Sequence, residues 1–169
     1  ENSVIVFYGD HDAKLGMEEM SRILPLKNTP LDELEIKKVP LIIHLPGGLK
    51  KGSYNVLGGQ EDIAPTLMNI LGIDYSSAYW MGSDIFNNDN DRLVPFRSHS
   101  FIQSNLAFIT PTGQYKDGSV FNLQTGEKVS KNLKDIYDKA DIMLKISERL
   151  IKGDLIREFT SGKRDSRSH

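Results

Sequence analysis

The sequence contains no cysteine, a single tryptophan and no long uninterrupted apolar run. The absence of cysteine excludes disulfide bonds and thiolate-ligated metal sites. No stretch approaches the roughly 20 apolar residues that a membrane-spanning helix needs. Lys and Arg number 21 against 23 Asp and Glu, so nothing favours a nucleic-acid partner. What is present is 38% hydrophobic and 26% charged residues over 169 positions, which predicts a globular chain with a real core.

Two short apolar runs in the first half of the chain predict strands. Residues 3–8 end at Gly9, and residues 39–45 end at the sequence Pro46-Gly47-Gly48. Continuous apolar runs of this length, closed by turn residues, are typical of strands buried on both faces.

Helical patterns are weaker in this half, with one exception. Residues 14–24 have a mixed pattern that allows a helical turn or two, and residues 28–38 are predicted to form a loop. In GGQEDIAPTLMNILGID, residues 58–74, apolar positions recur at helical spacing. Asp62 suits the N-cap of this helix and Gly72 suits its C-terminal end.

The second half of the chain has a different texture. Short runs split by turn residues lie at 92–96, 100–102, 106–110, 114–115 and 119–122. Turn residues at 111–113 and 116–118 predict two hairpins, and therefore an antiparallel meander. Residues 132–159 predict a long amphipathic helix with a break at Gly153. Its apolar stripe consists of Ile136, Ala140, Met143, Leu144, Ser147, Leu150 and Ile151.

The order of these elements predicts an α/β fold with an antiparallel appendage. We expect residues 1–91 to belong to the α/β core and residues 92–160 to form the meander and its covering helix. Residues 161–169 are polar and basic, which predicts a disordered tail.

Asp10 and His11 directly follow the first predicted strand. Ligands bind beyond the carboxyl ends of strands in α/β sheets, and a carboxylate beside a neutral imidazole is a good ligand pair for a divalent metal ion. Adjacent residues of a strand point to opposite faces, so a tight turn after Gly9 is needed to bring both side chains to one ion. The alternative is structural: Asp10 caps a turn and His11 is a satisfied polar residue. A third ligand is also needed, and Asp12 is the nearest further candidate in the sequence.

Other polar motifs favour structural interpretations. Residues 47–53 follow a strand, but Gly52 stands where a phosphate-binding loop has its lysine, so we interpret them as a glycine-rich turn. Residues 84–91 lack the central glycine and final glutamate of a calcium loop and are interpreted as a solvated loop. His44 interrupts an apolar strand and is interpreted as a buried, hydrogen-bonded histidine. His99 is a weaker candidate for a substrate contact.

Five stretches, taken together, resemble one family. They are YGDH at 8–11, KVPLIIHLPG at 38–47, GGQEDIAPTLMNILGID at 58–74, MGSDIF at 81–86 and VPFRSHSFI at 94–102. Most of residues 3–125 is similar to the C-terminal part of the extracellular catalytic domain of lipoteichoic acid synthases. These are phosphoglycerol transferases of the sulfatase and alkaline phosphatase superfamily. The resemblance implies the C-terminal portion of a sulfatase-like α/β fold.

The resemblance also implies a chemistry. Family members hold a manganese ion with a glutamate, a threonine and an Asp-His pair. The threonine attacks phosphatidylglycerol, and the glycerophosphoryl group then passes to a growing polyglycerolphosphate chain. Asp10 and His11 match the Asp-His ligands. The glutamate and the nucleophile are expected upstream of Glu1, and neither Thr66 nor Thr110 replaces the threonine. We therefore expect an inactive piece of a membrane-anchored enzyme that works at the extracellular face of the cell membrane.

Two further hypotheses stay open. The chain is a piece of a related sulfatase or phosphohydrolase, which would have a cysteine or serine nucleophile upstream, or it is a binding module without catalysis. A binding module predicts a well-covered sheet, whereas a piece of a larger domain predicts an exposed apolar sheet surface that favours self-association. Two departures from the family pattern leave substrate detail open: Asp12 replaces an aromatic residue or glycine, and residues 98–100 replace an Asn-Gly type of turn.

Overall fold

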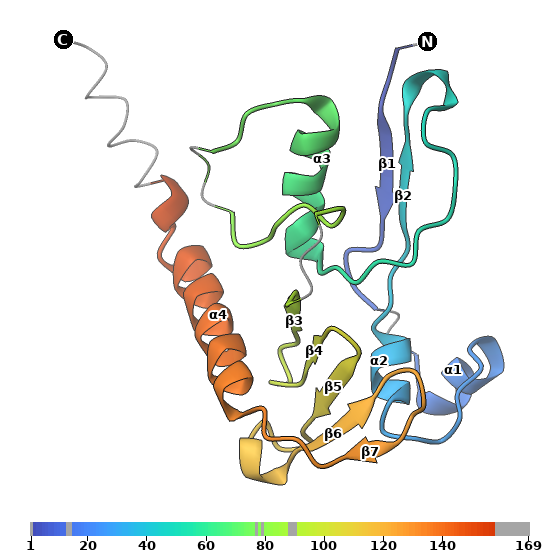
Figure 1. Cartoon of the computed structure of the whole chain (residues 1–169), viewed down its shortest axis with the longest axis vertical. Coiled ribbons are helices and arrows are strands. Elements are labelled where there is room, and N and C mark those ends of the chain that lie inside the picture. The colour runs from blue at the N-terminus through green and yellow to red at the C-terminus, as the bar shows by residue number, and fades with distance from the viewer. Residues whose placement is uncertain (1, 13–14, 77, 79, 88–90, 158–169) are drawn as a thin grey trace. The chain divides into compact units, whose positions relative to one another are not determined.

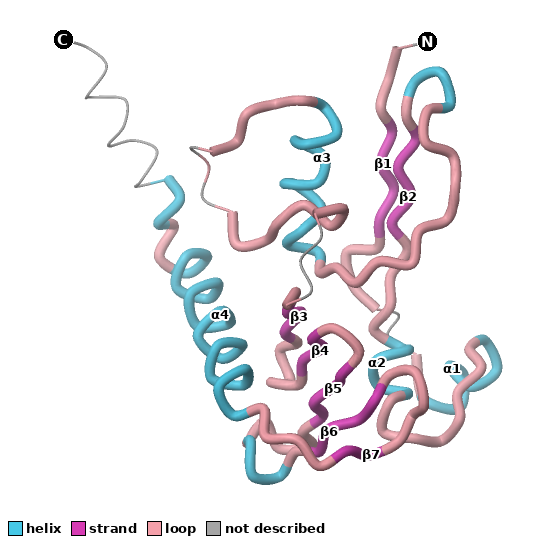
Figure 2. Tube along the Cα trace, in the orientation of Figure 1, coloured by secondary structure: helices cyan, strands magenta, loops and turns pink. Residues whose placement is uncertain are grey.

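A computed structural model describes residues 2–12, 15–76, 78, 80–87 and 91–157 (Figures 1 and 2). The chain divides into two compact units, residues 1–55 and 56–169. The boundary predicted after residue 91 lies inside the second unit, and the predicted tail lies outside the described residues. Helices occur together with two antiparallel sheets among the described residues, which agrees with the predicted C-terminal part of a sulfatase-like α/β fold. Within the described residues, no helix is both long and apolar enough to cross a membrane.

The first unit contains an antiparallel ribbon of two strands, β1 (Ile5–Tyr8) and β2 (Leu41–His44). Phe7 lies opposite Ile42, and these side chains are 65% and 60% exposed. The two predicted strands are confirmed, but the prediction that they are buried on both faces is wrong for this chain. Within the described residues these two strands pair only with each other, so the ribbon has no neighbouring strand of the kind that helps to bury a central strand, and its apolar side chains stay exposed.

Two short helices lie between these strands in the sequence, α1 (Met17–Ile23) and α2 (Asp32–Ile36). Helix α1 confirms the helical turns predicted in residues 14–24. Helix α2 shows that the loop predicted for residues 28–38 is wrong over residues 32–36. The buried carboxylate of Asp32 accepts hydrogen bonds from the backbone N–H groups of Lys27 (3.1 Å) and Thr29 (3.0 Å). These bonds close the turn before α2 and fix the direction in which the helix starts.

The second unit begins with α3 (Ile63–Leu71), which follows a 3-10 turn at Gln60–Asp62. Asp62 occupies the N-cap position and Gly72 ends the helix with a φ of 66°, so the helix and its predicted ends are confirmed. A left-handed φ is readily adopted by glycine, which has no Cβ to clash with the following carbonyl.

Five strands then form an antiparallel meander in sequence order, as predicted. They are β3 (Leu93–Pro95), β4 (Phe101–Gln103), β5 (Leu106–Ile109), β6 (Ser119–Asn122) and β7 (Lys128–Val129). The predicted strand at 114–115 is wrong, because Tyr115–Asp117 is a 3-10 turn. The two predicted hairpin turns are also wrong, since both lie in the single connection between β5 and β6. Strand β7 was not predicted because two residues carry no readable alternation.

The core of the second unit lies on one face of this sheet. Phe101 lies opposite Phe108, which in turn lies opposite Val120, so the three side chains share a face. Phe101 and Phe108 are almost fully buried, and their rings stack with centroids 5.1 Å apart. Gly118 makes room for this stack, because a Cβ there would lie 2.1 Å from Cζ of Phe108.

Helix α4 (Lys134–Lys152) covers this face and packs beside β3 (Figure 1). Ala140 of this helix is 1% exposed and belongs to the buried core. The helix breaks at Gly153, as predicted, and residues 155–157 are helical again; the last two residues of the predicted range, 158–159, lie outside the described residues. Its predicted apolar stripe is buried or half-buried except for Ile151, which is 70% exposed.

Candidate metal centre

Gly9 controls how the chain leaves β1. Its N–H donates a hydrogen bond to the carbonyl of Pro40 at 3.1 Å. A Cβ at position 9 would lie 2.7 Å from Cβ of Val39, closer than real Cβ atoms approach one another. Glycine is therefore the residue that allows this close passage beside the neighbouring segment. Asp10 and His11 follow directly, beyond the last ladder pair, Tyr8 with Leu41.

The imidazole of His11 is oriented by the backbone. Nδ1 lies 2.7 Å from the carbonyl oxygen of Asp12, and a carbonyl can only accept, so the proton of a neutral ring is on Nδ1. This leaves the lone pair on Nε2, which lies 3.7 Å from Oδ1 of Asp10. The hydrogen bond to the Asp12 carbonyl and then the negative charge of Asp10 raise the pKa of His11 above its ordinary value. Metal-binding histidines are commonly oriented by such a bond from the other ring nitrogen.

The donor set fits a divalent cation in part. One carboxylate oxygen and one imidazole nitrogen 3.7 Å apart can both contact an ion that lies about 2.1 Å from each. The two side chains are 82% and 63% exposed, so the pair is open to further ligands. Asp12, the third candidate from the sequence, has its carboxylate 3.7 Å from Nζ of Lys37. Among the described residues, no group of three or more Asp, Glu and His side chains could hold a metal ion.

The other two described histidines lie elsewhere. His44 is exposed at the end of β2, so its interpretation as a buried histidine is wrong. His99 lies in the β3–β4 turn with a φ of 64°, and its buried Nδ1 is 3.3 Å from Oδ1 of Asp141 on α4. No described contact links His99 to a substrate site, so its substrate role stays a prediction.

The two threonines set aside in the sequence are structural. Thr66 is fully buried; its hydroxyl donates to the carbonyl of Asp62 at 2.6 Å and accepts the N–H of Ile85 at 3.0 Å. Thr110 is 2% exposed, and its hydroxyl donates to the carbonyl of Gln114 at 2.8 Å. A hydroxyl that is buried and engaged in this way cannot reach a phosphorus atom.

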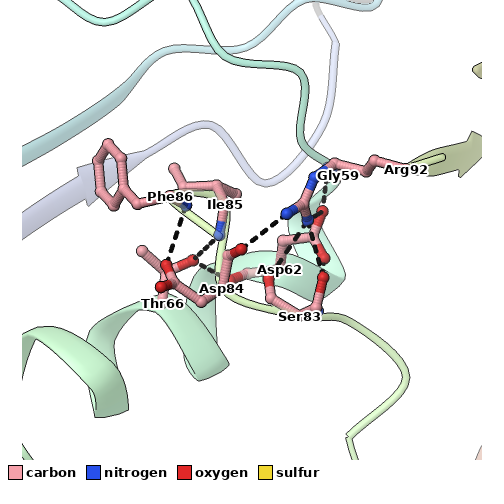
Figure 3. A network of polar contacts seen from close by, with 8 residues as sticks. All are labelled: Gly59, Asp62, Thr66, Ser83, Asp84, Ile85, Phe86 and Arg92. Atoms are coloured by element: carbon pink, nitrogen blue, oxygen red, sulfur yellow. Dashed lines mark hydrogen bonds and ion pairs between the residues drawn. The ribbon is translucent and has the colours of Figure 1, made fainter. Parts of the chain in front are cut away.

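Thr66 belongs to a buried polar network in the second unit, drawn in Figure 3. Asp62 and Arg92, 4% and 7% exposed, form an ion pair of 3.2 Å. The Asp62 carboxylate also accepts the N–H groups of Gly59 (2.9 Å) and Ser83 (2.7 Å). Arg92 donates in addition to the hydroxyl of Ser83 at 2.9 Å and to the carbonyl of Asp84 at 2.7 Å. Both charges therefore have several partners, as buried charges require.

Asp84 extends this network. Its carboxylate accepts Nδ2 of Asn69 at 2.7 Å and the N–H of Phe86 at 3.1 Å, and the residue is 8% exposed. The interpretation of residues 84–91 as a solvated loop is therefore wrong at Asp84, and residues 88–90 lie outside the described part. The sequence analysis missed the network because its members are far apart in the sequence. The available signal was an arginine and two aspartates close to apolar motifs.

Glu61 lies next to the network, and its surroundings disfavour the ionised form of its carboxyl group. Burial raises the pKa of its carboxyl group above the ordinary value, and the neighbouring Asp62 carboxylate acts in the same direction. The side chain is half-buried.

Comparisons with known proteins place these features in context. Residues 1–73 match the family model described as Sulfatase. The chain is 34% identical over 165 residues to lipoteichoic acid synthase 1 of Bacillus subtilis (strain 168), an alignment that covers 93% of this chain and 24% of that protein. It is 31% identical over 164 residues to the lipoteichoic acid synthase-like YvgJ of the same strain, covering 93% and 25%. Identity to the lipoteichoic acid synthase of Staphylococcus aureus (strain USA300) is 30% over 167 residues, covering 94% and 24%. The chain thus spans about a quarter of the length of the curated relatives it matches.

Proposed function

We propose that this chain belongs to the sulfatase-like family that includes the lipoteichoic acid synthases, which it resembles over most of its length, and that it supplies Asp10 and His11 as metal ligands of a phosphoglycerol transferase. The enzyme moves glycerophosphate from phosphatidylglycerol to a growing lipoteichoic acid chain at the extracellular face of the cell membrane. Its threonine nucleophile and its glutamate ligand come from residues outside these 169. The ion is manganese, and the chain alone is inactive and binds it weakly.

The observation that supports this proposal is the orientation of His11. Its Nδ1 is held by the Asp12 carbonyl at 2.7 Å, and its Nε2 faces the Asp10 carboxylate at 3.7 Å. This arrangement leaves one ring nitrogen and one carboxylate oxygen close together and open at the surface, as a pair of metal ligands requires. Gly9 sets the position of both residues through its close passage beside Val39.

Each residue has a separate task in this mechanism. Asp10 brings a negative charge that offsets part of the charge of the ion, and His11 brings a neutral donor of fixed direction. When bound, the metal ion lowers the pKa of the attacking hydroxyl and neutralises charge on the phosphoryl oxygens. Because protons and metal compete for Nε2, acid weakens the hold of His11 on the ion.

The test compares the full-length gene product with the 169-residue chain in phosphatidylglycerol turnover with Mn²⁺. We expect turnover in the full-length protein, none in the chain alone, and a loss of about 100-fold or more for Asp10→Ala or His11→Ala. Asp12→Asn is the matched control: it keeps the backbone carbonyl that orients His11, so activity stays within a few-fold of the unchanged protein. Turnover by the chain alone would contradict the proposal.

The main alternative, a related sulfatase or phosphohydrolase, is supported by the match of residues 1–73 to the sulfatase family model. It uses the same two ligands but a different nucleophile. Release of free glycerophosphate or sulfate by the full-length protein, with no transfer to a polyglycerolphosphate acceptor, would favour it.

A further inference from the structure

The outward side of α4 carries a stripe of exposed residues that the core does not use. The stripe consists of Lys139, Ile142, Ile146 and Arg149. Steps of three, four and three residues place these side chains along one side of the helix, over a length of about 15 Å. Ile142 is 55% exposed and Ile146 is 46% exposed. The buried Ala140 lies on the other side, against the sheet.

The cations at the two ends of the stripe differ from the other cations of α4. Within the described part of the chain, no carboxylate pairs with Lys139 or Arg149. The ion pairs along the helix are Lys134–Asp138, Lys145–Asp141 and Lys152–Glu148. Asp135 lies one turn before Lys139 and limits the stripe at that end. Two isoleucines are therefore bracketed by two uncompensated positive charges.

The charge of the chain is also distributed unevenly. Residues 139–169 contain eight Lys and Arg against five Asp and Glu, whereas residues 1–138 contain 13 against 18. The exposed stripe therefore lies in the positively charged part of a chain that is negative overall. Such a stripe is complementary to a surface that has anionic groups on the outside and an apolar layer beneath them.

We propose that this stripe docks α4 flat on an anionic lipid surface. Ile142 and Ile146 enter the boundary between headgroups and acyl chains, and Lys139 and Arg149 reach the lipid phosphates. A protein partner fits less well, because a stable interface covers about 800 Å² on each side and a stripe one side chain wide offers much less. The proposal does not depend on the metal site, so either can fail without the other.

The test is co-sedimentation of the 169-residue chain with vesicles of phosphatidylglycerol and phosphatidylcholine, compared with vesicles of phosphatidylcholine alone. We expect binding to the anionic vesicles that weakens as salt is raised. Ile142→Ser with Ile146→Ser should lower the partition coefficient about tenfold or more, because two apolar anchors are lost. Lys139→Glu with Arg149→Glu, which leaves the apolar residues in place, should lower it as strongly.

Ile151→Ser is the matched control, because Ile151 is 70% exposed on the same helix but is not on the side that carries Ile142 and Ile146. It should bind like the unchanged chain, and circular dichroism checks that every variant keeps its helix content. Equal binding to neutral and anionic vesicles, or equal loss in the control, would overturn the proposal. A stripe variant that changes the molar mass of the lipid-free chain would also overturn it, since the stripe would then contact a second copy.

Discussion

At the scale of single residues, the second unit contains a buried ion pair between Asp62 and Arg92. Removing one partner of a buried ion pair leaves the other charge without compensation in a region of low dielectric constant. We expect Arg92→Ala to lower the free energy of unfolding by about 3 kcal/mol, measured by urea denaturation. Arg97→Ala is the control: Arg97 is exposed, and its loss should cost less than about 0.5 kcal/mol. Equal effects of the two substitutions would mean that the network does not stabilise the unit.

Two residue pairs show what could be predicted from the sequence and what could not. Asp10 and His11 are adjacent in the sequence and directly follow an apolar run that ends at Gly9. Their relative position therefore depends on one short turn, which the neighbouring residues predict. Asp62 meets Arg92 only after α3 and the following loop have folded, and no local pattern encodes that contact. The sequence also does not identify a third metal ligand. Asp12, the candidate next to the pair, has its carboxylate near Lys37 instead.

At the scale of elements, α2 depends on one carboxylate. Burial acts to raise the pKa of Asp32, but hydrogen bonds from the backbone N–H groups of Lys27, Thr29 and Asn28 and from the Thr29 hydroxyl together lower it below its ordinary value. A lowered pKa means that Asp32 stabilises the fold fully above about pH 4 and that this contribution is lost as the pH falls through the folded-state pKa. Asp32→Asn should therefore destabilise the chain at pH 6 and much less at pH values below the folded-state pKa, measured by urea unfolding across this range. A difference that stays constant with pH would contradict the role of the charge.

Elements with strong local signals were predicted well. Helix α3 has apolar periodicity, an aspartate at its N-cap position and Gly72, and it ends where these signals place its end. Helix α4 has a long amphipathic pattern, and its break lies at the predicted Gly153. Helix α2 and strand β7 were missed because five and two residues are too few for periodicity to show. The turns of the meander were misplaced because Pro and Gly mark bends without saying which strands pair.

At the scale of the whole molecule, the apolar side of the β1–β2 ribbon is the feature with the largest consequence. Ile5, Phe7 and Ile42 share one side by register and are 47%, 65% and 60% exposed. The sequence predicted two apolar strands correctly and their burial wrongly, because burial depends on what packs against a strand rather than on the strand itself. The chain spans about a quarter of the length of its relatives.

An exposed apolar ribbon with two open edges favours pairing with another ribbon of the same kind. We expect the 169-residue chain to self-associate reversibly at concentrations of tens of micromolar or more, with mean mass rising with concentration in sedimentation velocity. Ile42→Lys should shift the monomer to higher concentrations, because a charge on the apolar side opposes its burial against a second copy. Leu49→Lys adds the same charge at a side chain that is 67% exposed outside the ribbon, and should leave the association unchanged. A chain that stays monomeric, or two variants that behave alike, would show that the ribbon does not drive association, and the exposed side would then need a partner other than a second copy of this chain.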